Sequence, residues 1–287
     1  MTNCLEIKFK TWGEWLMADD PNSCNQVIGE LLWDRATASV FDVLAKEDTL
    51  LSVALVNNFA ARHYFQVQTL RIRRLADGGS DVSSLARIIK EMRDASHIIN
   101  RQNLLQLRNV EDLATAKALE EKYMIEHLNE PWFRDYKESL TYKERIHNQC
   151  DNLFYKGDKG ELKKSVLSKL DSKLKTADSI AIYVNKMVAH SVIPSGRQKV
   201  DKKHLQINYK KIDKAIEELV GVFNFLTLFI NENSVVSVPL GWDMAVEKMT
   251  KEQVDIVSNS WKELSVKTEQ WRKWGTDLLA KNPSYRN

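Results

Sequence analysis

The sequence is poor in cysteine, glycine and proline. Its three cysteines, Cys4, Cys24 and Cys150, are an odd number and lack the CxxC spacing of zinc ligands. A disulfide framework and a metal site are therefore not expected, and reduced thiols in the cytoplasm are the default. The 10 glycines and 5 prolines in 287 residues are too few for the many turns of an all-β protein and favour long helices.

Long apolar runs are also missing. No stretch reaches the roughly 18 apolar residues that a transmembrane helix needs, and the N-terminal stretch MTNCLEIKFKTWGEW lacks the apolar core of a secretory signal. We therefore expect a cytoplasmic protein with no membrane partner. With 43% hydrophobic and 28% charged residues, the chain is long enough to bury a sizeable core.

The net charge of +3 is too small to indicate nucleic-acid binding by itself, but the charge is unevenly spread. Seven Lys or Arg residues stand against two Asp residues in the segment 197–214. This basic run has the composition of a surface that follows a nucleic-acid backbone, with Tyr209 available for stacking. It is also the ordinary composition of a solvated face. The basic residues are Arg197, Lys199, Lys202, Lys203, Lys210, Lys211 and Lys214.

Apolar residues recur at three- and four-residue spacing along most of the chain, which predicts helices. The expected ranges are 27–46, 50–76, 139–153, 161–191, 209–231 and 251–281. Asp81 or Ser83 would cap a further helix over 85–92. The more polar stretch at about 100–155, which Pro131 interrupts, predicts a helical insertion. Trp261, Trp271 and Trp274 form a stripe that would pack on the helices or, alternatively, form a dimer surface.

The predicted fold class is all-α, an up-down helical bundle with short connections between antiparallel neighbours. We divide the chain into an N-terminal segment (1–26), the bundle with its insertion (27–234) and a C-terminal helical extension (235–287). No internal repeat and no low-complexity segment occurs.

The stretch YVNKMVAHSVIPSGR, residues 183–197, carries the strongest functional signal. Tyr183, Lys186 and His190 are spaced to share one helix face, whereas Ile180 and Val184 fall on an opposite, packing face. Histidine titrates near working pH, so a face with an imidazole, an ammonium and a hydroxyl suits metal-free cleavage of a phosphodiester. The alternative is that the histidine is a structural cap at the helix end.

Two blocks of the sequence resemble the HEPN superfamily (higher eukaryotes and prokaryotes nucleotide-binding). NKMVAHS, with Asn185, Lys186 and His190, is similar to the end of its signature helix. The stretch TLRIRRLADGGSDVSSLARIIKEM, residues 69–92, looks like the N-terminal half of the abortive-infection U type. The two blocks bracket roughly residues 28–232.

The resemblance implies a HEPN-like RNA-binding protein, or a metal-independent endoribonuclease, that acts as a homodimer in prokaryotic phage defence by abortive infection. No cofactor is implied. His190 would be the general acid and base. Lys186 or Arg197 would stabilise phosphate charge, and Asn185 and Tyr183 would orient the substrate. The remaining substrate-binding side chains would be Lys199, Lys202 and Lys203.

The chain departs from the family pattern at Val184, where the family has an arginine. Two interpretations remain open. Lys186 or Arg197 supplies the missing positive charge, although a lysine acts as a point charge and lacks the two-pronged geometry of arginine. Otherwise the protein is a catalytically inactive helical interaction or scaffold protein, or a partner in a toxin–antitoxin pair.

Arg71, Arg74 and Asp77 lie one turn apart at the end of the predicted helix 50–76. They would either face a phosphate or form an ion network that joins this helix to its neighbours. The histidines show no metal-ligand spacing with acids or cysteines. GGSD, residues 78–81, lacks the lysine and the preceding strand of a P-loop.

Overall fold

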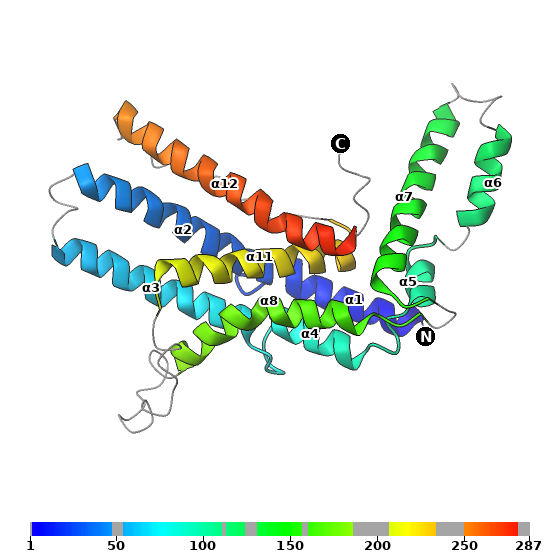
Figure 1. Ribbon diagram of the computed structural model, residues 1–287, viewed down its shortest axis with the longest axis horizontal. Coiled ribbons are helices and arrows are strands. Elements are labelled where there is room, and N and C mark those ends of the chain that lie inside the picture. The colour runs from blue at the N-terminus through cyan, green and yellow to red at the C-terminus, as the bar shows by residue number, and fades with distance from the viewer. Residues whose placement is uncertain are drawn as a thin grey trace. The chain divides into compact units, whose positions relative to one another are not determined.

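Helices form nearly all of the described chain (Figure 1). The computed structural model describes residues 2–47, 54–110, 113–123, 131–156, 160–185, 207–233 and 250–280. Within these ranges two isolated antiparallel bridges, Asn100–Glu161 and Phe154–Leu162, are the only β pairing. The prediction of an all-α helical bundle is confirmed. The helices are α1 (Thr2–Met17), α2 (Cys24–Glu47), α3 (Ala54–Ala76), α4 (Leu85–Asp94), α5 (Arg101–Leu107), α6 (Leu113–Tyr123), α7 (Pro131–Leu153), α8 (Lys164–Tyr183), α11 (Tyr209–Asn231) and α12 (Lys251–Leu279).

Helix ends agree with the prediction where the sequence carries a clear cap. The helix predicted over 209–231 is α11, with the predicted bounds. The side chain of Asn208 accepts a hydrogen bond from the backbone N–H of Lys211 at 2.9 Å, and Glu232 ends the helix in the left-handed region at φ 62°. The stop of α3 at Ala76, before the paired glycines, is also as predicted.

One predicted cap and two predicted helix starts are wrong. The α4 cap is Ser84, not Asp81 or Ser83, because its Oγ accepts from the backbone N–H of Arg87 at 3.1 Å. The helix α7 begins at Pro131 and not at 139, since proline fits the first helical position. The helix α8 begins at Lys164 and not at 161, because residues 161 and 162 are held in the two bridges.

The helix α1 was not predicted, although the sequence carries its signal. Leu5, Phe9, Trp12 and Leu16 recur at three- and four-residue spacing, and all four are buried. The residues between them are largely charged and polar, so the composition of the segment does not reveal the apolar stripe, whereas its spacing does.

The described chain divides into two compact units, and four of the helices named above, α1, α4, α8 and α12, have residues in both. The first unit comprises Met1–Thr11, Glu91–Ser168 and Asp277–Asn287; the second comprises Trp12–Lys90 and Lys169–Thr276. In the first unit α6 and α7 pair as a helical hairpin, and Lys117 of α6 forms an ion pair with Glu144 of α7 at 2.7 Å. The predicted insertion at about 100–155 lies within this unit.

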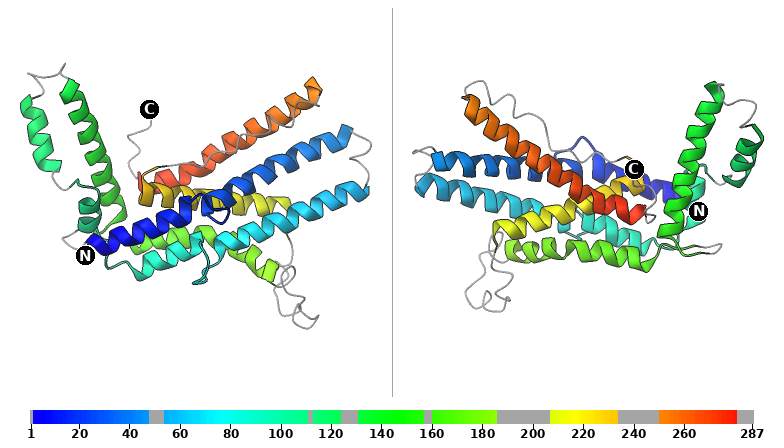
Figure 2. Two further views of the ribbon diagram at one scale, coloured as in Figure 1. Left: turned by 180° about the vertical axis from the view of Figure 1, so that it is seen from behind. Right: turned by 45° about the horizontal axis from the view of Figure 1, so that its top comes forward.

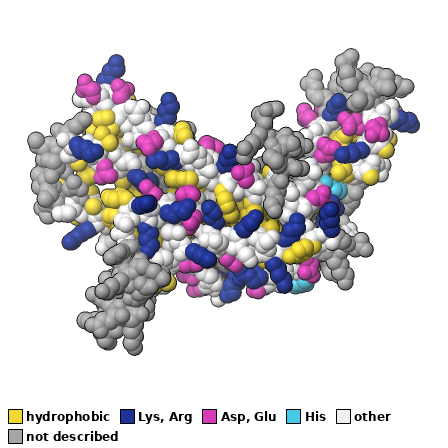
Figure 3. Space-filling model, viewed as in Figure 1, with side chains coloured by type: hydrophobic (Ala, Val, Ile, Leu, Met, Phe, Trp, Pro, Cys, Tyr) yellow, Lys and Arg dark blue, Asp and Glu magenta, His cyan; other side chains and the backbone are white. Residues whose placement is uncertain are grey.

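The second unit is built around α11, which is the most buried helix of that unit. Fifteen of its 23 residues are buried. The helices α2 and α3 lie side by side in every view, and both contact α11 (Figures 1 and 2). Arg35 of α2 joins Asp213 of α11 through two hydrogen bonds of 2.5 and 3.0 Å. Charged side chains of both signs are interspersed over α2 and α12 on the face shown in Figure 3.

The predicted tryptophan stripe of α12 packs within the second unit. Trp261 meets Trp33 of α2 edge to face, with ring centroids 5.1 Å apart. Trp274 lies over Gly221 of α11, where a Cβ atom would stand 3.1 Å from the indole. The Lys173 ammonium lies 4.9 Å from the centroid of the Trp274 ring.

Candidate functional site

The end of α8 has one face in the core and another that borders open space. Ile180 and Val184, predicted on the packing face, are both fully buried (0% exposed). Tyr183, predicted on the functional face, is half-buried. The helix widens into a π-helical turn at Val184 and Asn185, a change that is frequent at functional sites. The Asn185 Oδ1 atom is buried, and the described residues offer it no hydrogen-bond partner.

Most of the predicted catalytic and substrate-binding segment lies outside the described residues. This holds for Lys186 and His190, and equally for Arg197, Lys199, Lys202 and Lys203. The structure therefore places two of the predicted side chains, Tyr183 and Asn185. These two are neighbours of Val184, the position at which the resemblance to the HEPN pattern leads us to expect an arginine.

A cavity of about 440 Å³ lies beside Tyr183, and we call it the Tyr183 cavity. Most of its wall is one face of α3, because residues three and four positions apart share a helix face. The wall mixes polar and apolar side chains, and among the described lining residues the guanidinium of Arg62 is the one charged group. The lining residues are Asn58, Ala61, Arg62, Phe65, Gln66, Thr69, Tyr183 and Ile207.

Arg71 and Arg74, predicted either to face a phosphate or to join an ion network, are engaged within the protein. Arg71 forms ion pairs with Glu30 and Asp34 of α2, the first with an Nε–Oε2 distance of 2.8 Å. The Nη2 group of Arg74 donates to the backbone oxygen of Asn22 at 2.9 Å. These contacts join α3 to α2 and to the turn before it, as the network interpretation requires.

Asp77, the third member of that predicted group, shapes the turn after α3. Its Oδ1 accepts a hydrogen bond from the backbone N–H of Gly79 at 3.0 Å, and its backbone oxygen accepts one from the hydroxyl of Ser84. The Nη2 group of Arg73 lies 3.9 Å from the Oδ2 atom of Asp77. We therefore assign Asp77 to the connection between α3 and α4.

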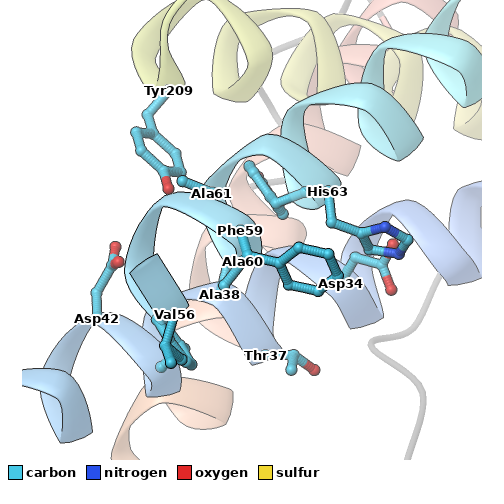
Figure 4. A pocket seen from close by; sticks show the side chains of 12 residues that line it. Asp34, Thr37, Ala38, Asp42, Val56, Phe59, Ala60, Ala61, His63 and Tyr209 are labelled. Carbon is cyan, nitrogen blue, oxygen red and sulfur yellow. The ribbon is translucent and has the colours of Figure 1, made fainter. Parts of the chain in front are cut away.

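A second cavity, of about 430 Å³, lies between α2 and α3 (Figure 4), and we call it the Phe59 cavity. Phe59 is 72% exposed and stacks on His63 with ring centroids 6.3 Å apart. Two carboxylates, Asp34 and Asp42, also line this cavity. An aromatic wall with acidic groups is unfavourable for a phosphate, because the carboxylates repel it.

Tyr209, expected to be available for stacking on a base, already contacts two aromatic rings of α3. Its ring centroid lies 5.4 Å from that of Tyr64 and 4.7 Å from that of Phe65, so part of the ring surface is engaged within the bundle. Burial raises the pKa of the Tyr64 hydroxyl, which keeps that group neutral. The basic residues on α11 are partly engaged as well, since Lys214 forms an ion pair with Glu217 at 2.9 Å.

The two buried cysteines and His147 are other candidate reactive groups, and their surroundings favour a structural role. Burial raises the pKa of the Cys24 and Cys150 thiols to about 12, so neither is a ready nucleophile. The Nε2–H of His147 donates to the backbone oxygen of Val110 at 2.7 Å. Within the described ranges no group of three His, Cys, Asp or Glu side chains is arranged to hold a metal ion.

Comparison of the chain with protein-family models, with characterised proteins and with solved structures returned no match. No described helix is long and apolar enough to cross a membrane.

The sequence did not single out Arg62, which the structure brings to Tyr183. The two residues are far apart in the chain, and Arg62 belongs to no motif. Its only signal is the polar stripe Asn58, Arg62 and Gln66 at four-residue spacing on α3. Such a stripe is ordinary on an exposed helix face. Only its position beside the Tyr183 cavity, which the sequence does not show, makes it a candidate for binding.

Proposed function

We propose that this protein is a HEPN-like RNA-binding protein of prokaryotic phage defence that cleaves RNA without a metal ion, as a homodimer. One observation carries the proposal. At the end of α8, Val184 is fully buried, while the adjacent Tyr183 borders a cavity in which Arg62 is the one charged group among the described lining residues. One face of the motif is therefore buried in the core, and the other borders a cavity that contains a positive charge. A site that binds a polyanion at this end of α8 needs this arrangement.

The proposed reaction is transesterification through the ribose 2′-hydroxyl. A base removes the 2′-hydroxyl proton, the oxygen forms a bond to phosphorus, and the bond from phosphorus to the 5′-oxygen breaks. An acid then protonates the departing 5′-oxygen, which leaves a 2′,3′-cyclic phosphate and a 5′-hydroxyl. We assign the acid and base steps to His190 and the stabilisation of phosphate charge to Lys186 or Arg197. Asn185 and Tyr183 orient the substrate.

The test is cleavage of mixed RNA in EDTA by the wild-type protein, by His190→Ala and by His97→Ala. His97 is exposed and serves as a matched control. Removing a general acid and base typically slows the reaction by about 10²- to 10⁴-fold. We expect His190→Ala to show that loss, His97→Ala to cleave as the wild type does, and the products to carry cyclic phosphates.

The opposite results are equally informative. Equal, negligible cleavage by the wild-type protein and His190→Ala would reject the nuclease part and favour the inactive interaction or scaffold protein. Cleavage that His190→Ala retains would place the chemistry elsewhere in the protein. Sedimentation equilibrium of the same preparations tests the proposed homodimer.

A further inference from the structure

The position of the missing arginine is closed to a charged side chain. Val184 is 0% exposed, as is Ile180 one turn earlier. An arginine at position 184 would have its first side-chain carbons in this buried position, and an unpaired buried charge is strongly unfavourable. A cation that meets RNA at this end of α8 must therefore come from another position.

Arg62 on α3 is such a cation. It lines the same cavity as Tyr183, and its side chain is exposed. The other described lining residues are neutral, so none of them offsets its positive charge. The nearby amides of Asn58 and Gln66 add hydrogen-bond donors and acceptors on the same face of α3.

Arg62 differs from the other described arginines of α3 in its interactions with the protein. Arg71 and Arg74 are engaged with α2 and the preceding turn, and Arg73 lies 3.9 Å from the Asp77 carboxylate. Arg62 has no ion pair or hydrogen bond with any described residue. A guanidinium whose donors are not taken up by the described residues can offer them to a ligand, and its planar fork suits a phosphate.

We infer that Arg62 binds a phosphate of the RNA backbone in the Tyr183 cavity and replaces the motif arginine that Val184 has displaced. The inference rests on the proposed function. The volume of about 440 Å³ lies within the range of ordinary small-ligand sites and accommodates one nucleotide. The Tyr183 hydroxyl and the two amides would hydrogen-bond to the sugar and the phosphate.

The experiment measures binding of a short fluorescein-labelled single-stranded RNA by fluorescence anisotropy at several salt concentrations. The RNA carries 2′-O-methyl groups, which prevent attack by the 2′-oxygen, so binding is measured without cleavage. The variants are Arg62→Ala, Arg62→Lys and Arg73→Ala. Arg73→Ala removes the same charge from the same helix and is the matched control. Circular dichroism at rising temperature verifies that each variant is folded.

We expect Arg62→Ala to weaken binding about tenfold and to reduce the slope of log K against log salt by about 0.7, the contribution of one phosphate contact on a single strand. Arg62→Lys should restore part of the affinity, and Arg73→Ala should differ little from the wild type. If the wild type binds and the two alanine variants bind equally well, the inference fails and the proposed function stands. If the wild type does not bind RNA, both fail.

Discussion

Glu218 is a buried acid in the middle of α11. It is 8% exposed, and burial raises the pKa of its carboxyl group, an effect that a hydrogen bond from Thr176 and the charges of Lys214 and Lys173 oppose. Its Oε2 atom has no hydrogen-bond partner within the described chain. The protonated form therefore fits this place better than the carboxylate does.

The stability of the protein should consequently depend on the protonation of Glu218. Because the folded state raises the pKa above the ordinary value of 4.5, this group contributes most stability below about pH 4.5 and loses it as the pH rises through the raised pKa. Glu218→Gln keeps the shape and stays neutral. We expect the difference in the free energy of unfolding between this variant and the wild type to shift in favour of the variant as the pH rises. Urea denaturation at several pH values measures it.

Glu217→Gln is the control for this experiment, since Glu217 is only half-buried on the same helix and pairs with Lys214 at 2.9 Å. Its stability relative to the wild type should not improve with pH. Parallel pH profiles of the wild type and Glu218→Gln would contradict the assignment.

The sequence predicts which side of a helix a residue occupies better than it predicts what the residue meets. The spacing of Ile180, Tyr183 and Val184 placed two of them in the core and one outside it, and their burial agrees. The same reasoning could not pair Tyr183 with Arg62, because that proximity arises from the packing of distant helices. For the same reason, the spacing could not predict the aromatic contacts that Tyr209 makes with α3.

At the scale of elements, the sequence predicts helices best where periodicity and caps agree. The helix α11 has a continuous apolar pattern and an asparagine cap, and its bounds were predicted. The start of α8 was not, because Glu161 and Leu162 satisfy their backbone groups through bridges to residues 100 and 154. Such non-local pairing leaves no periodic trace in the sequence.

The approach of α12 to α11 depends on small residues at their contact. A Cβ atom on Gly275 would stand 2.5 Å from the backbone oxygen of Gly221 and 2.7 Å from the backbone nitrogen of Phe225. The Asn224 amide donates to the backbone oxygen of Arg272 at 2.8 Å. This close contact cannot relax by turning a side chain, because two of the atoms met belong to the backbone.

Gly275→Ala should therefore destabilise the protein. Alanine favours a helix over glycine by about 1 kcal/mol, but the forced separation of two packed backbones costs more than that gain. We expect a net loss of about 1 to 3 kcal/mol in the free energy of unfolding, as for other overpacked sites. Chemical denaturation monitored by circular dichroism measures it.

Gly78→Ala is the matched control, because nothing lies within 4 Å of a Cβ atom built there. Its effect should be near zero or slightly stabilising, by up to about 1 kcal/mol, since alanine restricts the unfolded chain. Equal stabilities for the two variants would show that α11 and α12 separate without cost.

At the scale of the whole molecule, each compact unit contains one buried thiol. Cys24 lies in the second unit and Cys150 in the first, both are 0% exposed, and burial raises both pKa values to about 12. Cys4 is exposed. A thiol reagent reaches the two buried groups only when the surrounding unit opens.

The two thiols should therefore report the opening of the two units separately, in a Cys4→Ser background that removes the fast reaction. Gly275→Ala weakens the second unit, and Leu104→Ala removes a buried side chain of α5 in the first unit. Every 1.4 kcal/mol raises an opening equilibrium constant about tenfold. We expect Gly275→Ala to speed labelling of Cys24 more than that of Cys150, and Leu104→Ala to do the reverse, measured by mass spectrometry of labelled peptides. If each variant instead speeds both thiols by the same factor, the chain opens as one cooperative body, and the helices with residues in both units transmit the loss of stability between them.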